Sequence, residues 1–275
     1  MSSVVINDEF MYQFRKKLDE NHFYGVDRKT FFLGVGGEEV IVETRSKFMS
    51  SFNKARMGTP NNILLRVGNS LLIDNRLSGF LDSEILNSDN VIQLWNFVTF
   101  FNHHISNLSY TALTLYALDT LDLSGKTILD LGCGEGVLSL FVLKKGAKKV
   151  HSVDGDSKYE VLIKNNLRLN NLEPNSLAFI PALFHEENKI FEAIGNHQSN
   201  LALVNVGPHF GESDLVAFSL LNAIPGINQV LAGGYYSNSK FGPTRAVIRL
   251  ASLGFKKNLK YFDFNNQHLN FLVER

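Results

Sequence analysis

Residues 126–140 read KTILDLGCGEGVLSL, and this stretch limits the fold more than any other part of the chain. A short apolar run ends at Asp130, glycines follow at Gly132, Gly134 and Gly136, and a second apolar run begins at Val137. The first run is typical of a buried strand and the second of a helix. Glycines leave the backbone bare, and the free N–H groups at a helix start can bind a ligand. The stretch therefore predicts a strand-to-helix turn that holds a ligand.

The rest of the chain after residue 90 continues this alternation of strands and helices. We expect strands at 127–131, 149–154, 177–180, 201–205 and 229–232, and helices at 137–145, 158–170, from 213, and at 244–253. The final stretches KKNLKYFDF and HLNFLVER predict an antiparallel hairpin. Such a pattern predicts an α/β fold with a doubly wound, mostly parallel sheet. Ligands of these sheets bind at the carboxyl ends of the strands, where the strand order reverses.

The residues before position 90 show a mixed pattern. DEFMYQFRKKLDEN has helical spacing, and TFFLGVGGEEVIVET and NILLRVGNSLLID each predict two strands joined by a glycine turn. RSKFMSSFNKARMGTP is basic and aromatic, and we interpret it as a helix with a solvated face in preference to a substrate lid. NVIQLWNFVTFFNHH and SYTALTLYALDTL are expected to be helices. We expect two domains, an α+β cap or substrate-recognition region at 1–89 and the ligand-binding domain at 90–275.

A carboxylate in the second strand of the large domain adds to the glycine signal. Asp154 ends the run KKVHSVD, 22 residues after Gly132, which is the spacing at which an acidic residue holds the ribose of a nucleotide cofactor. The dinucleotide fingerprint G-x-G-x-x-G requires a third glycine at position 137, and that residue is Val137. We consider three hypotheses for the function of the chain. A nicotinamide-dependent oxidoreductase is the least favoured of them, because the third fingerprint glycine is missing.

The arrangement D-x-G-x-G-x-G at 130–136 resembles motif I of class I S-adenosylmethionine-dependent methyltransferases. LDTLDLSGKTILDLGCGEGVLSLFVLKKGAKKVHSVDGDS, followed by NNLRLNNL, is similar to the bacterial methyltransferases that modify a ribosomal protein on amino groups, and the resemblance covers residues 107–275. It implies a seven-stranded Rossmann-like sheet, S-adenosylmethionine as cofactor and S-adenosylhomocysteine as product, and no metal. It also implies N-methylation of a protein, with a small molecule as the second choice of acceptor and a nucleic acid not favoured.

The resemblance assigns roles to individual residues. Asn205, after the fourth strand, is the expected catalytic residue, because its side-chain oxygen would orient a neutral acceptor amine. Asp130 is expected beside the amino group of the cofactor's methionine, and Asp154 at the ribose. The expected cofactor-binding residues are Thr111, Asp130, Gly132, Cys133, Gly134, Gly136, Asp154, Gly155, Ala182 and Asn205.

Three departures from the family keep a second hypothesis open. The family's glycine-rich segment and T-H-P-T-T are replaced by HHISNLSYT, so that only Thr111 matches. AFIPALF lacks the aspartate that many class I methyltransferases place at the adenine amino group, so backbone groups near Ala182 would have to serve. After Asn205 the chain reads VGPHFG, which changes the acceptor pocket. A degenerate methyltransferase fold used for binding is therefore the second hypothesis.

Composition excludes further classes. Lys+Arg and Asp+Glu both number 27, which argues against a dominant polyanion-binding surface but leaves a local basic patch open. The single cysteine, Cys133, excludes an internal disulfide and a cysteine-cluster metal site. MSSVVINDEFMYQF does not have the pattern of a signal peptide, and the most apolar window, residues 91–101, is too short to span a bilayer. We expect a cytoplasmic protein without a membrane partner; the oligomeric state is not predicted.

Overall fold

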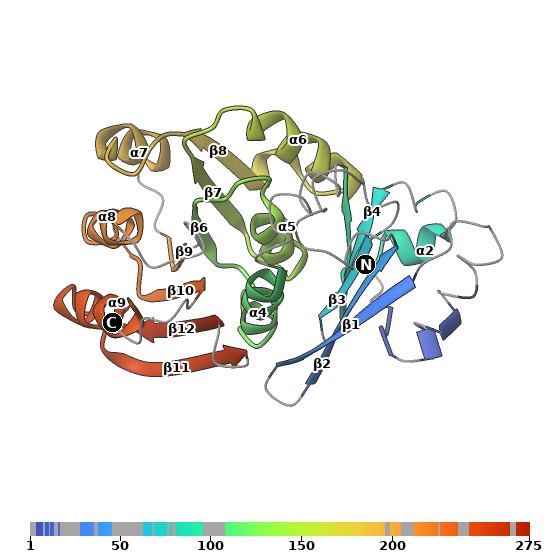
Figure 1. Ribbon diagram of the computed structural model, residues 1–275. Coiled ribbons are helices and arrows are strands. Elements are labelled where there is room, and N and C mark those ends of the chain that lie inside the picture. The colour runs from blue at the N-terminus through green and yellow to red at the C-terminus, as the bar shows by residue number, and fades with distance from the viewer. Residues whose placement is uncertain are drawn as a thin grey trace.

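The residues that the structure describes form two β-sheets, with helices around the larger one (Figure 1). The structure is a computed structural model. It describes residues 4–7, 9–10, 12–13, 16, 28–35, 38–45, 63–67, 69–75, 78, 81–95, 108–195, 199–204, 212–224, 226–235, 242–264 and 268–275. Among the helices within these ranges, none has both the length and the apolarity that crossing a bilayer requires.

The larger sheet has seven strands in the order β11-β12-β10-β9-β6-β7-β8. Strands β8, β7, β6, β9 and β10 run parallel, and β12 lies antiparallel between β10 and β11. The strands are β6 (Thr127–Leu131), β7 (Lys149–Asp154), β8 (Leu177–Pro181), β9 (Leu201–Val204), β10 (Gln229–Tyr235), β11 (Lys257–Phe264) and β12 (His268–Glu274). The predicted α/β class, the mostly parallel sheet and the C-terminal hairpin are confirmed. The strand order reverses between β6 and β9, so a ligand site is expected at this edge of the sheet.

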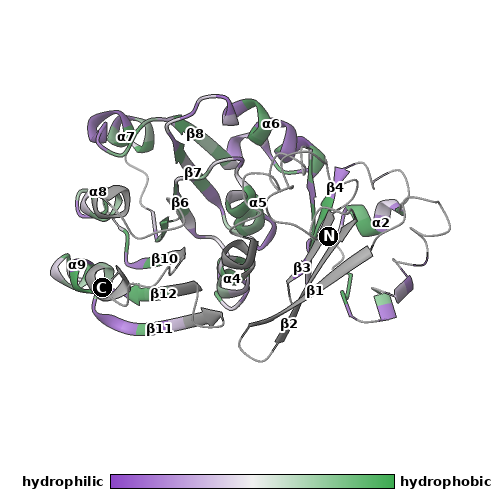
Figure 2. Ribbon diagram, in the orientation of Figure 1, coloured by the Kyte–Doolittle hydropathy of each residue, from purple (hydrophilic) through white to green (hydrophobic). Residues whose placement is uncertain are grey.

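Helices cover both faces of this sheet, as Figure 1 shows. They are α4 (Leu108–Asp119), α5 (Val137–Lys144), α6 (Tyr159–Leu169), α7 (Glu187–Ile194), α8 (Glu212–Leu220) and α9 (Gly242–Ser252), with a short 3₁₀ turn η4 (Pro174–Ser176). Alternate residues of each strand face opposite cores. Ile128 packs with α4, α5 and α6, whereas Leu129 and Leu131 pack with α7, α8 and α9. Buried apolar strands with two separate cores are what a doubly wound sheet requires, and Figure 2 shows the green, hydrophobic character of β6, β7 and β8.

The N-terminal sheet has five strands in the order β1-β2-β3-β4-β5. They are β1 (Arg28–Val35), β2 (Glu38–Arg45), β3 (Ile63–Val67), β4 (Ser70–Asp74) and β5 (Val91–Leu94), and a short helix α2 (Ser83–Leu86) precedes β5. Both predicted hairpins are confirmed, because β1 pairs antiparallel with β2 and β3 with β4. The described residues between 9 and 16 are helical, as expected, and the basic stretch 46–56 lies outside the described residues.

One predicted helix is wrong at its start. Residues 90–104 were expected to be helical, but Val91–Leu94 form β5, which pairs in parallel with β4. All four residues are buried, so the run shows no period that separates a strand from a helix. Residues 96–107 lie outside the described part of the chain. The first sheet runs on to Leu94, and the division of the chain at residue 89 stays a prediction.

Side chains of the large domain hold the free edge of β5. Asn170, directly after α6, accepts a hydrogen bond from the Gln93 amide through Oδ1 at 2.8 Å and donates from Nδ2 to the Gln93 carbonyl at 2.7 Å. One turn earlier, Asn166 Oδ1 accepts from the Trp95 amide at 2.7 Å. Two asparagines four residues apart, one on α6 and one directly after it, therefore take the place of a neighbouring strand's backbone.

Candidate active site

The glycine turn between β6 and α5 has the backbone that its sequence predicts. Gly132, Gly134 and Gly136 all have positive φ, at 79°, 51° and 77°. At Gly136, the residue that precedes α5, an added Cβ would also lie 2.7 Å from Ile163 Cγ1. Only glycine combines the left-handed conformation with that close approach. The turn is thus fixed by backbone conformation and by packing against α6.

Asp154 connects this turn to the turn after β7. Its Oδ2 accepts a hydrogen bond from the Gly134 amide at 2.9 Å, and its Oδ1 accepts one from the Asp156 amide at 3.0 Å. Each carboxylate oxygen retains a second lone pair for a ligand hydroxyl. The predicted ribose-binding residue is therefore held in place by the two loops that it joins.

Asp130, at the end of β6, is fully buried below the glycine turn. Burial raises the pKa of its carboxyl from 3.8 to about 6, with a smaller contribution from Asp154, while the hydrogen bond from Ser139 opposes this rise. Ser139 Oγ donates to Asp130 Oδ2 at 2.6 Å and lies 2.8 Å from Ser152 Oγ. Among the described residues, Asp130 Oδ1 has no hydrogen-bond partner. A buried carboxylate oxygen without a partner is costly, and a hydrogen-bond donor that reached it would relieve this cost.

Glu135 is a second buried carboxyl in the same turn, and the sequence reasoning missed it. Its side chain is only 4% exposed, and burial raises its pKa from 4.5 to about 7, against the opposing charge of Lys158. The available signal was a charged residue between two motif glycines, where small residues suffice. Carboxyls with strongly shifted pKa values are frequent at functional sites.

A cavity of about 390 Å³ opens at the carboxyl ends of β6, β7 and β8. This volume lies within the range of small-molecule sites, roughly 300–1,000 Å³. Its lining consists of Gly132, Asp154, Gly155, Asp156, Ala182, Leu183 and Phe184. Four of the predicted cofactor-binding residues, from three separate strand ends, therefore meet in one cavity.

The β8 side of the cavity is mainly apolar. The Leu183 side chain is 51% exposed, and a Cβ at Gly155 would lie 2.4 Å from its Cδ2, so the glycine admits this leucine. Both backbone amides expected to serve a ligand here already have acceptors. The Ala182 amide donates to the Asp154 carbonyl at 3.0 Å, and the Leu183 amide donates to Glu186 Oε2 at 2.7 Å.

The remaining predicted residues occupy different positions. Cys133, Gly134 and Gly136 form the turn, whereas the side chain of Thr111, on α4, and the whole of Asn205 lie outside what the structure describes. Burial raises the pKa of the Cys133 thiol well above its ordinary value, which opposes a nucleophilic thiolate. Within the described ranges, no three His, Cys, Asp or Glu side chains are grouped as a metal ion would require.

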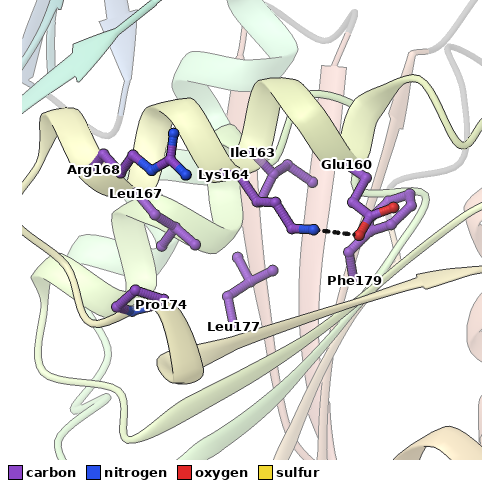
Figure 3. A pocket seen from close by; sticks show the side chains of 8 residues that line it. All are labelled: Glu160, Ile163, Lys164, Leu167, Arg168, Pro174, Leu177 and Phe179. Carbon is purple, nitrogen blue, oxygen red and sulfur yellow. Dashed lines mark hydrogen bonds and ion pairs between the residues drawn. The ribbon is translucent and has the colours of Figure 1, made fainter.

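A second cavity, of about 320 Å³, lies between α6 and β8 (Figure 3). Its walls include Ile163, Leu177 and Phe179, and an ion pair of 2.6 Å joins Lys164 to Glu160 beside it. It contains none of the predicted cofactor residues. The 390 Å³ cavity at the strand ends is therefore the candidate active site.

The part of the chain that forms this cavity is similar in sequence to known proteins. Residues 107–199 match the family described as ribosomal protein L11 methyltransferase (PrmA). The ribosomal protein L11 methyltransferase of Vibrio cholerae is 42% identical over 71 residues, which are 26% of this chain and 24% of the relative. The Escherichia coli protein of the same name is 37% identical over 86 residues, or 31% of this chain and 29% of the relative. The chain thus spans about a quarter of the length of the curated relatives that it matches.

A solved structure resembles this chain in fold over a longer range than the sequence matches cover. The ribosomal protein L11 methylase of Lactobacillus delbrueckii subsp. bulgaricus superposes with a TM-score of 0.53 at 16% identity, covering 74% of this chain and 94% of that chain. At this identity the superposition shows the fold alone. The resemblance inferred from the motifs is confirmed for residues 107–199, and the large domain has the Rossmann-like fold of these methyltransferases.

Proposed function

We propose that the chain is an S-adenosylmethionine-dependent methyltransferase that methylates an amino group of a protein. The observation that carries the proposal is the cavity in which Gly132, Asp154, Gly155 and Ala182 meet at the strand ends. The match of residues 107–199 to a methyltransferase family supports the same reaction.

The residues present fit the cofactor. Asp154 offers carboxylate lone pairs for the ribose hydroxyls, and the glycine turn lets a ligand approach its backbone closely, although the amides of Gly132, Cys133, Gly134 and Gly136 already donate within the protein. Asp130 Oδ1, buried and without a described partner, suits the ammonium group. The exposed Leu183 side chain offers an apolar surface to the adenine ring.

In this mechanism the protein residues mainly position the reactants and need to supply little chemistry of their own. When bound, the cofactor supplies a methyl group already activated on a sulfonium. The chain would align the acceptor nitrogen for in-line attack and exclude water. The nitrogen must be a neutral amine, which forms its bond to carbon as the sulfur–carbon bond breaks and then releases a proton. Asn205 is the proposed orienting residue, through its side-chain oxygen.

The proposed acceptor class is based on the names of the relatives, which act on ribosomal protein L11. A direct test incubates the purified chain with S-adenosylmethionine and ribosomal protein L11, then searches for methylated amines by mass spectrometry. We expect methylation by the wild type, and we expect Asn205→Ala to lower the rate at least tenfold. Full turnover by Asn205→Ala would exclude the proposed role of this residue, and a screen of small amines covers the alternative acceptor.

A catalytically degenerate binding protein is the second candidate, and one observation favours it. The Ala182 and Leu183 amides both have acceptors within the protein, and AFIPALF provides no aspartate to the adenine side. Cofactor binding without transfer to any acceptor would support this candidate over the first.

A further inference from the structure

Basic side chains gather at the edge of the large sheet that lies opposite the cavity. β6, β7, β10 and β11 begin at this edge, and β12 ends there. We call these residues the basic edge: Lys126, Lys148, Lys149, Lys256, Lys257, Lys260 and Arg275. Since a strand rises about 3.3 Å per residue, five residues place the basic edge roughly 17 Å from the cavity.

Contacts around Glu274 show that this cluster is continuous. The Lys256 amide donates to the Glu274 carbonyl at 2.7 Å, and Lys257 is the register partner of Glu274. Lys126 Nζ donates to Gln229 Oε1 at 3.1 Å, and Gln229 Nε2 donates to Glu274 Oε1 at 2.7 Å. Lys148 joins on the other side, because its amide donates to the Lys126 carbonyl at 2.8 Å.

The charge of the basic edge is only partly balanced by acids. Hydrogen bonds from Asn258 and Gln229, with the nearby charges of Lys260 and Lys126, lower the pKa of Glu274, so this acid is ionised. Asp122 lies in the turn before Lys126, and Glu173 lies just before β8, which begins at the same edge of the sheet. The seven basic residues thus outnumber these three acids, in a chain whose formal net charge is zero.

Apolar side chains are interleaved with these lysines. Residues 256–261, KKNLKY, are all exposed, and the ladder of β11 with β12 is irregular between Lys257 and Lys260. Tyr261 is 54% exposed and Leu259 is 39% exposed. Figure 2 shows the start of β11 as a hydrophilic purple segment at the end of the sheet.

We propose that the basic edge binds single-stranded nucleic acid. Lysine ammonium groups neutralise backbone phosphates, and an exposed tyrosine offers a face on which an unpaired base stacks. The exposed Tyr261 favours this partner over an acidic polypeptide, which uses the charges but not the ring. The bound strand is a partner and not the methyl acceptor, because the cavity lies at the opposite edge of the sheet.

The test is fluorescence anisotropy with labelled 12-nucleotide oligouridine and oligothymidine over a series of salt concentrations. The variant Lys256→Gln/Lys257→Gln/Lys260→Gln removes three charges, each contributing about 0.7 to the slope of log K against log salt for single strands. We expect weaker binding with a slope shallower by about 2. We expect Tyr261→Ala to weaken binding about tenfold at an unchanged slope, and Tyr261→Phe to retain it.

The matched control removes three exposed charges from another face, in Lys164→Gln/Arg168→Gln/Lys189→Gln. It is expected to bind oligonucleotides as the wild type does. Binding of S-adenosylmethionine by each variant reports folding and separates this proposal from the proposed function. Absence of salt-dependent binding, or equal loss in the control, would overturn the proposal. Polyglutamate binding as tight as oligouridine, with no effect of Tyr261→Ala, would assign the surface to acidic polypeptides instead. The two oligonucleotides distinguish RNA from DNA.

Discussion

At the scale of single residues, Asp130 and Glu135 place two buried carboxyls in one turn. A folded-state pKa above the unfolded value means that the folded protein binds the proton more tightly. Stability from such a group is present at low pH and is lost as the pH rises through the folded pKa. For Asp130 this window runs from 3.8 to about 6, and for Glu135 from 4.5 to about 7.

The substitution Asp130→Asn separates structure from function. Without cofactor, the variant is expected to be more stable than the wild type at pH 8, by up to about 3 kcal/mol, because a buried charge is removed. It is expected to bind S-adenosylmethionine at least tenfold more weakly, because the ammonium loses its carboxylate. Urea unfolding and calorimetry measure the two effects. If Asp130→Asn were less stable and bound S-adenosylmethionine as tightly as the wild type, the role of Asp130 would be purely structural.

Cofactor affinity should also depend on pH. In the proposed role, only an ionised Asp130 would hold the ammonium group, so the association constant is expected to fall about tenfold per pH unit below pH 6 and to level off above it. Titrations between pH 5 and pH 8 measure this dependence, with Asp130→Asn as the control expected to be flat. A wild-type affinity independent of pH over this range would remove Asp130 from the ammonium site.

The substitution Glu135→Gln tests the second buried carboxyl, whose pKa is also raised in the folded protein. At pH 8 it is expected to raise the free energy of unfolding, and at pH 4 to change it little, since the carboxyl is then mostly protonated in both states. Urea unfolding at both pH values gives the comparison. The exposed Glu192→Gln is the control and should behave as the wild type at each pH. If Glu135→Gln were less stable than the wild type at pH 8, the result would contradict our inference that the buried Glu135 carboxylate destabilises the folded protein.

At the scale of elements, Asn166 on α6 and Asn170 directly after it join this helix to β5 of the N-terminal sheet. Asn170→Ala leaves the buried amide and carbonyl of Gln93 without these partners, and is expected to cost about 1–3 kcal/mol. Asn165→Ala, on the same helix, is expected to stay within about 0.5 kcal/mol of the wild type. Urea unfolding measures both variants. Hydrogen exchange provides the site-specific readout, since Asn170→Ala should reduce protection at the Gln93 amide, and unchanged protection would contradict the contact.

These elements also show what the sequence could and could not predict. The turn from β6 to α5 was predictable, because glycine spacing and a strand-ending aspartate are local signals. β5 was not, because its run is buried on all sides and its edge partners, Asn166 and Asn170, lie more than 70 residues away in sequence. The partnerless oxygen of Asp130 was equally hidden, since it arises from packing and not from residue type.

At the scale of the whole molecule, the large sheet separates two surfaces. Its carboxyl edge carries the cavity with Asp154, and its opposite edge carries the basic side chains around Glu274. The zero net charge of the chain does not reveal this asymmetry. Composition gives only the sum of the charges, whereas folding determines where on the surface each charge lies. The expectation from composition, that no polyanion surface dominates, is thus compatible with a local basic edge.

The central claim is that the cavity at the ends of β6, β7 and β8 binds S-adenosylmethionine. Calorimetric titration tests it most directly, with S-adenosylmethionine, S-adenosylhomocysteine and NAD titrated into the wild type, Asp154→Ala and the exposed control Glu192→Ala. We predict that both sulfur compounds bind the wild type and the control, that Asp154→Ala loses at least tenfold in affinity for both, and that NAD does not bind. Binding of NAD in preference to the sulfur compounds, or sulfur-compound binding unchanged in Asp154→Ala, would contradict the account.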